Sequence, residues 1–176
     1  MLEERDSPLA GVVQSSGELA SVPVAVPQKH KSMIPASINS WSLPGKESHW
    51  TRYPSPISLE AAVKDTTARL QTLPHEELAF LIVDPEGRAT ASLSFPGDET
   101  QVTPDLQQLM ALAIGIGASG FVMIHNHPSG NASPSRQDIV VTRQISNMAR
   151  TTGMTLFDHV IVADAAVFTF RGSGLI

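Results

Sequence analysis

Residues 120–138 read GFVMIHNHPSGNASPSRQD, and this stretch decides both the fold and the chemistry expected of the chain. Its apolar part, residues 121–124, is short and lies between a glycine and a proline, which favours a buried strand over a helix. His125 and His127 follow at the C-terminal end of that strand. Residues two apart on a strand point to the same face with Cα atoms about 7 Å apart, so both imidazoles can bind one metal ion.

The segment after the histidines offers a third ligand. Ser133, Pro134 and Ser135 are typical of a helix start, with a serine as N-cap and a proline in the first turn, so Asp138 falls in the first turn of a helix. Two histidines, a carboxylate and an open water position are typical of catalytic zinc, since a structural site uses four protein ligands. Asp138 also stands three residues after Ser135, the spacing of a capping box, which is the structural alternative.

The spacing of these residues resembles a known motif. His-x-His-Pro at residues 125–128 with Ser-x-x-Asp at residues 135–138 resembles the JAMM motif of JAB/MPN+ metalloproteases. The sequence HNHPSGNASPSRQD at residues 125–138, together with DHVIV at residues 158–162, resembles the RadC family in particular. The resemblance covers the chain from about residue 59 to the C-terminus.

The resemblance implies a JAB/MPN fold, which is cytidine-deaminase-like. It also implies a Zn²⁺ held by His125, His127, Asp138 and a water, with Ser135 assisting beside it. The JAMM pattern further requires a glutamate on an upstream strand.

Two adjacent glutamates, Glu76 and Glu77, precede the strand-like run at residues 78–83. Family members place their glutamate eight residues before an aspartate, and counting back from Asp84 selects Glu76. Alternation puts Glu76 on the same face as Leu78, toward the core or a cleft, where a carboxylate needs a partner. Either glutamate taken alone has another interpretation, a solvated charge at a strand end.

Hydrophobic periodicity and turn residues predict the rest of the domain. The expected elements are a helix over residues 59–70, a hairpin over 77–95, a helix over 106–116, a helix ending near Thr151, and a last pair of strands after residue 155. Together they predict the α/β class with a mixed sheet. The JAMM resemblance implies the finer architecture: a three-layer α/β/α domain with a curved sheet and a zinc cleft at the end of its central strand. His159, in the last pair of strands, is interpreted as a satisfied buried histidine rather than a ligand.

The N-terminal third differs in composition. Residues 1–57 hold seven of the thirteen prolines, so we expect a largely irregular, Pro- and Ser-rich leader or linker, followed by the RadC-like domain over residues 58–176. Trp41 and Trp50 are interpreted as packing back onto the domain, with anchoring of a partner protein as the alternative.

Charge limits the classes of partner. Residues 59–176 hold seven Lys and Arg against twelve Asp and Glu, so the whole net charge of −5 resides there and direct DNA binding is disfavoured. Arg136, Arg143 and Arg150 recur every seven residues, which predicts a solvated helix face; contact with phosphates or an acidic partner is the alternative. An acidic N-terminus and the absence of a long apolar run predict a soluble, cytoplasmic protein without a membrane span. The sequence does not indicate an oligomeric state.

Two functions are compatible with these features. The first is a JAMM-type zinc metallopeptidase acting on a peptide or protein substrate, which cleaves a peptide or isopeptide bond with a zinc-activated water. Glu76 would move the proton from the water to the leaving amine, and Ser135 would donate a hydrogen bond to the oxyanion. The second is a RadC-like accessory protein of DNA repair or of a mobile element, which binds a partner and keeps the metal for structure. An additional inward glutamate favours hydrolysis.

Overall fold

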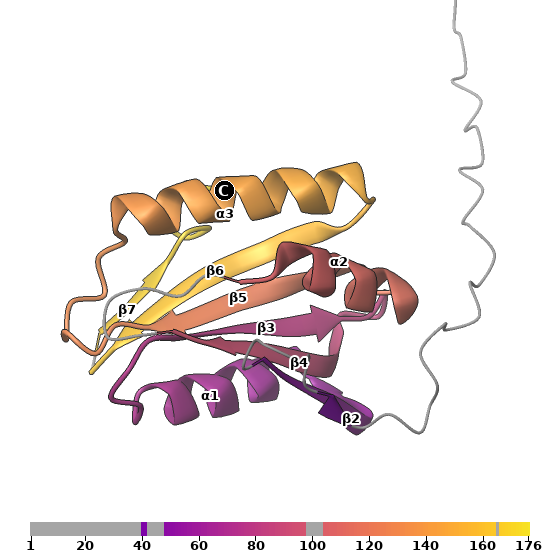
Figure 1. Ribbon diagram of the computed structural model, residues 1–176, viewed down its shortest axis with the longest axis horizontal. Helices are drawn as coiled ribbons and strands as arrows, with labels where there is room; N and C mark the ends of the chain where they lie inside the picture. The colour runs from indigo at the N-terminus through magenta and orange to yellow at the C-terminus, as the bar shows by residue number, and fades with distance from the viewer. Residues whose placement is uncertain (1–39, 42–47, 98–103, 165) are drawn as a thin grey trace, which may run out of the picture.

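A seven-stranded mixed sheet with helices on both faces forms the described part of the chain (Figure 1). The computed structural model describes residues 40–41, 48–97, 104–164 and 166–176. In chain order the elements are β1 (Ser40–Trp41), β2 (His49–Ser58), α1 (Leu59–Leu70), β3 (Glu77–Val83), β4 (Arg88–Pro96), α2 (Leu106–Gly115), β5 (Gly120–Asn126), α3 (Arg136–Thr151), β6 (Thr155–Ala163) and β7 (Ala166–Thr169). No helix among these is long and apolar enough to cross a membrane.

The sheet order is β1-β2-β4-β3-β5-β6-β7. Only β5 and β6 are parallel neighbours; every other neighbouring pair in this sheet is antiparallel. A parallel pair needs a crossover connection, and α3 supplies it between β5 and β6. The predicted mixed sheet, with a hairpin before the histidine strand and another after it, is therefore confirmed.

Alternation along the inner strands separates two hydrophobic cores. On β3, Phe80 and Ile82 pack with residues of α2 and α3, whereas Ala79 and Leu81 pack with residues of α1. Figure 1 shows α2 and α3 on one face of the sheet and α1 on the other. The three-layer α/β/α architecture is confirmed, and β5, buried along its whole length, lies inside the sheet between β3 and β6.

The sheet begins before the boundary expected at residue 58. Strand β2 starts at His49 and pairs with β4, although Pro54 and Pro56 suggested an irregular segment. The register of this pair shifts between Arg52 and Ile57, so both prolines fall in the bulged part of the strand, where a missing N–H group is tolerated. Residues 1–39 and 42–47 of the expected leader lie outside the described residues.

The two tryptophans stand opposite each other in the β1–β2 pair. The side chain of Trp50 is buried in the core that it shares with β4 and α2, as expected for a packing role. The side chain of Trp41 lies outside the described part of the chain.

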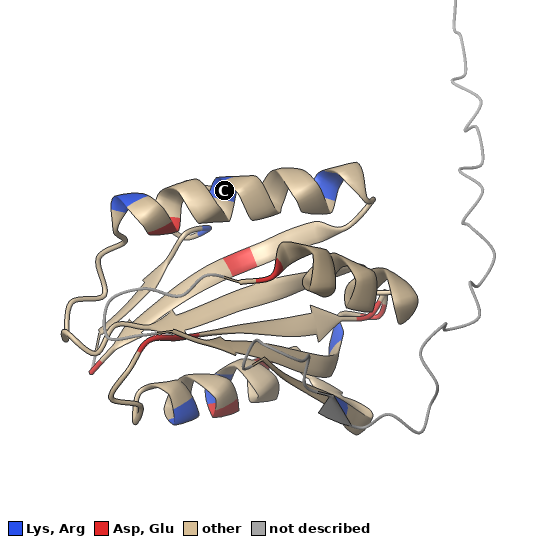
Figure 2. Cartoon of the chain, in the orientation of Figure 1, with Lys and Arg blue, Asp and Glu red and all other residues tan. Residues whose placement is uncertain are grey.

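The outer face of α3 carries the three arginines that recur every seven residues. Arg136, Arg143 and Arg150 are exposed, while Thr142, Ile145 and Ala149 are buried against the sheet. Figure 2 shows the basic residues spaced along this helix, with the other described Lys and Arg residues elsewhere in the fold. The arrangement agrees with a solvated helix face.

Candidate metal centre

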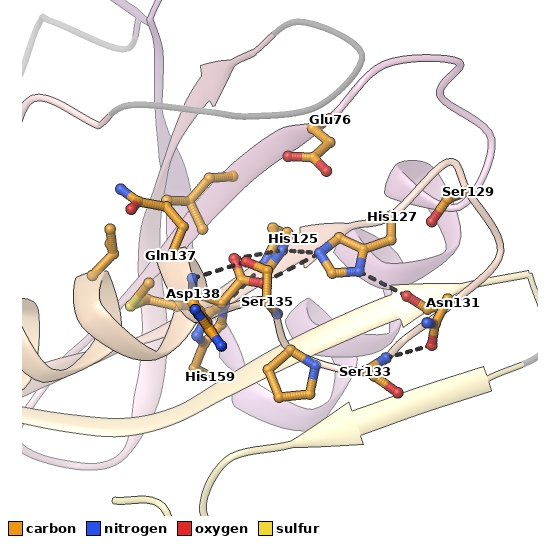
Figure 3. A pocket seen from close by; sticks show the side chains of 15 residues that line it. Glu76, His125, His127, Ser129, Asn131, Ser133, Ser135, Gln137, Asp138 and His159 are labelled. Atoms are coloured by element: carbon orange, nitrogen blue, oxygen red, sulfur yellow. Dashed lines mark hydrogen bonds and ion pairs between the residues drawn. The ribbon is translucent and has the colours of Figure 1, made fainter.

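Strand β5 brings the two histidines to one end of the sheet. His125 is the penultimate residue of β5, and the backbone N–H of His127 donates to the Val162 carbonyl at 2.8 Å, which continues the pairing with β6. The Nε2 atoms of the two imidazoles lie 2.8 Å apart. Figure 3 shows both rings converging on one point, as the two-residue spacing on a strand predicts.

Asp138 is both a capping residue and a neighbour of the histidines. Its backbone N–H donates to Ser135 Oγ at 3.1 Å, and its Oδ2 accepts from the backbone N–H of Ser135 at 2.7 Å, which completes a capping box. The same carboxylate places Oδ1 3.3 Å from His125 Nε2 and Oδ2 3.5 Å from His127 Nε2. The two interpretations of Asp138 are therefore compatible. The N-cap is Ser135 rather than Ser133, because Pro134 lies outside the helix.

These three side chains form a donor set that fits a metal ion. One ligand atom from each lies within 4.8 Å of the others. The Nδ1 atom of His127 lies 2.8 Å from the Asn131 carbonyl, which can only accept a hydrogen bond, so Nδ1 carries the proton. In the neutral ring, Nε2 then presents a lone pair to the same point as His125 and Asp138. Convergent lone pairs beside a carboxylate are stabilised by a cation.

Burial and pairing set the charges at this centre. Burial lowers the pKa of His125 to about 4, so the ring is neutral at pH 7. The hydrogen bond with Asp138 raises the pKa of His127 against the opposing effect of burial. Burial alone would raise the pKa of Asp138, but hydrogen bonding to His127, the electrostatic interaction with the His125 ring and hydrogen bonds with Ser135 hold it well below its usual range. A metal ion at this centre would take the place of a proton on His127.

Glu76 faces the same pocket, and Glu77 faces away from it. Leu78 is paired with His125, so continuing this antiparallel register brings Glu76 beside His127, whose pKa its charge raises. Glu77 is buried on the opposite face, where its Oε1 lies 2.8 Å from Nη1 of Arg69 in α1. The interpretation of Glu77 as a solvated charge is wrong, because α1 covers that face.

Asn126 is a buried site residue that sequence reasoning passed over. It lies between the two histidines and points to the opposite face of β5. Its Oδ1 accepts from the Glu77 backbone N–H at 2.8 Å, and its Nδ2 donates to the His75 carbonyl at 2.8 Å. Asn126 therefore holds the backbone on both sides of Glu76. An asparagine in a strand gives no local signal of such a long-range role.

The three donors line a pocket of about 760 Å³, within the size range of ligand sites. Its wall includes Glu76, Ser135 and the polar side chains of Ser129, Asn131 and Gln137 (Figure 3). His159 lies behind the histidine pair and is not part of the group of three donors. Both its ring nitrogens have partners, His125 Nδ1 and Thr142 Oγ1, as expected for a satisfied buried histidine.

Comparison with known proteins gives the chain its family. The family model of the RadC-like JAB domain matches residues 57–175. The UPF0758 protein of Porphyromonas gingivalis is 30% identical over 152 residues, which cover 85% of this chain and 66% of the relative. The UPF0758 protein of Methylibium petroleiphilum is 30% identical over 179 residues, covering 99% of this chain and 79% of the relative.

A shorter match, to the UPF0758 protein of Trichlorobacter lovleyi, is 34% identical over 97 residues and covers 54% of this chain and 42% of the relative. The chain thus spans less than two thirds of the length of some of its curated relatives. None of these three names states an activity. The extent of the family match and the donor group at residues 125, 127 and 138 lead to one assignment: the chain belongs to the family of RadC-like JAB domains.

Proposed function

We propose that this protein is a zinc-dependent hydrolase of the JAMM type, which cleaves a peptide or isopeptide bond. The observation that carries the proposal is a carboxylate outside the donor set: Glu76 lines the same pocket as His125, His127 and Asp138. A structural metal site has no use for such a group, whereas hydrolysis needs a base close to the metal.

The donor set supports zinc as the ion. Two imidazoles and one carboxylate leave a fourth position of a tetrahedral site open, which is the pattern of catalytic rather than structural zinc. When bound, zinc supplies a Lewis acid that lowers the pKa of water to about 7. All three donors line the pocket, so a substrate carbonyl could reach an ion that they hold.

The side chains around the centre have separate tasks in this proposal. Hydrolysis adds one water across the amide C–N bond: the oxygen joins the carbonyl carbon, and a proton reaches the leaving nitrogen. Glu76 takes that proton from the water and hands it to the nitrogen. Ser135 Oγ accepts from the Asp138 backbone N–H, which uses a lone pair, so its own proton can be donated to the developing oxyanion.

Charge favours a peptide or protein over DNA as the partner. Nonspecific DNA affinity comes from cations that neutralise phosphates. The net charge here is −5, and two of the described arginines, Arg69 and Arg88, are in ion pairs with carboxylates. Among the described Lys and Arg residues, only Arg136 lines the pocket beside the three donors.

The test is a cleavage assay in water enriched in ¹⁸O. Zinc-loaded protein is incubated with a peptide library made from a digested bacterial lysate and with a synthetic peptide that contains a lysine isopeptide bond. Mass spectrometry should detect new carboxyl termini that contain ¹⁸O, and Asp138→Asn should produce none. A fully zinc-loaded protein that cleaves neither class would contradict the proposal and favour the accessory function, in which the metal is structural.

A further inference from the structure

A chain of hydrogen bonds runs behind the metal centre and links α3, β6 and β5. Thr142 Oγ1 donates to the Asp138 backbone carbonyl at 2.5 Å, and the same oxygen lies 2.6 Å from His159 Nδ1. The other ring nitrogen of His159, Nε2, lies 2.8 Å from His125 Nδ1. This series of hydrogen bonds starts at the backbone carbonyl of Asp138 and ends on the ring of His125, and both residues belong to the donor set.

The Asp138 carbonyl, at the start of this series of hydrogen bonds, fixes the position of every proton in the series. A carbonyl only accepts, so the single hydroxyl proton of Thr142 points to it, and Oγ1 must accept from His159 Nδ1–H. A neutral His159 then has a bare Nε2, which accepts from His125 Nδ1–H. The remaining nitrogen of His125, Nε2, presents its lone pair toward His127 and Asp138.

Burial keeps both rings neutral, which this assignment requires. His159 and His125 are only 1% and 2% exposed, and Thr142 is fully buried. An imidazolium at this depth would lose its hydration at a cost of several kcal/mol, and for both rings this loss outweighs the attraction of the Asp138 carboxylate. The His159 ring is also held in its plane by stacking on Phe170, with ring centroids 4.5 Å apart and an interplanar angle of 16°.

We propose that His159 and Thr142 are positioning residues that hold the proton of His125 on Nδ1 and aim its Nε2 lone pair at the metal position. The opposite tautomer of His125 would place a proton on Nε2, where it would block the donor. The hydroxyl of a helical threonine often donates a hydrogen bond to the carbonyl four residues earlier, but this common contact does not account for the second hydrogen bond, with His159. The proposal rests on the metal site of the proposed function, although the tautomer is a property of the metal-free chain.

The first test uses nuclear magnetic resonance on the ¹⁵N-labelled, metal-free protein. Long-range ¹H–¹⁵N correlation distinguishes protonated from bare ring nitrogens. We expect protons on Nδ1 and bare Nε2 atoms in both His125 and His159. A proton on Nε2 of either ring would overturn the proposal, whatever reaction the protein catalyses.

The second test measures zinc affinity by competition with a chelator. Thr142→Val keeps the side-chain shape but removes both hydrogen bonds, so affinity should fall about 10- to 100-fold, the usual effect of losing a group that orients a metal ligand. Thr142→Ser restores the hydroxyl and should restore both the affinity and the ring spectrum. Thr66→Val, at a buried position of α1, is the matched control and should leave both unchanged.

The outcomes separate this proposal from the proposed function. Wild-type affinity in Thr142→Val, or an equal loss in Thr142→Ser, would contradict the positioning role. If Thr142→Val fails to fold, the serine variant and the wild-type ring spectrum still decide. A protein with the expected tautomers and affinities that cleaves no amide would refute the hydrolase and leave the positioning role standing.

Discussion

Glu76 and Glu77 are adjacent in the chain, and their replacement by glutamine should give opposite results. Glu76→Gln keeps the side-chain shape and leaves the three metal donors untouched. Zinc content and melting temperature should therefore stay close to those of the wild type. Turnover should fall about 100- to 10,000-fold, because the group that moves the proton is lost.

Glu77→Gln should lower stability and leave turnover unchanged. The ion pair with Arg69 has a separation of 2.8 Å and a buried carboxylate, but the Arg69 side chain is 47% exposed. A charged hydrogen bond contributes about 1.5 to 3 kcal/mol, and solvent screening of the arginine reduces this to about 1 kcal/mol. For a domain of this size, the loss corresponds to a decrease of about 4 °C in melting temperature.

Three measurements on both variants decide the matter: zinc content, melting temperature, and the rate with a peptide that the wild type cleaves. If Glu77→Gln is the inactive variant and Glu76→Gln is active, the assignment of strand faces to these two residues is wrong. If both variants remain active, the proposed mechanism fails.

Further variants test the charges and contacts around the centre. In the metal-free protein, the raised pKa of His127 stabilises the fold fully below its unfolded value of about 6.5, and this contribution is lost as pH rises through the folded pKa. The difference in free energy of unfolding between wild type and His127→Gln, measured with urea, should therefore shrink from pH 6 to pH 9. Ser135→Ala and Ser58→Ala both remove a serine N-cap, so calorimetry should find each destabilised by about 1 kcal/mol. Only Ser135→Ala should also lower turnover, and an equal rate in both would contradict the oxyanion role. Asn126→Ala leaves the Glu77 N–H and the His75 carbonyl without this partner, so urea unfolding should show a loss of about 1 to 3 kcal/mol. Its turnover should fall while zinc content is retained, and an unchanged rate would show that Asn126 does not position Glu76.

Much of the fold could be predicted because its signals are local. The apolar run before His125 and the turn at residues 84–88 define strands by their immediate neighbours. Alternation put Glu76 and Glu77 on opposite faces, and the family spacing to Asp84 selected Glu76. Strand β2 was missed for the same reason. Its two prolines are a local signal against a strand, whereas the bulge that accommodates them depends on pairing with β4.

The environment of the candidate site was less accessible from sequence. The ion pair of Glu77 with Arg69, the contacts of Asn126 and the bonds from His159 to His125 and Thr142 all join different elements. No spacing rule predicts such contacts, because they depend on how helices dock on the sheet. The spacing of Ser135 and Asp138 predicted a capping box. Only the structure shows that the Asp138 carboxylate can complete this capping box and also face the histidines.

The most direct test of the account is the zinc content of the purified protein after dialysis, measured by mass spectrometry of the metal. The wild type should contain close to stoichiometric zinc, and His127→Ala should contain almost none, because two remaining donors hold the ion poorly. Glu77→Gln, which lies on the opposite face, should keep the wild-type content. A His127→Ala protein that carries as much zinc as the wild type would contradict the assignment of His125, His127 and Asp138 as the metal centre.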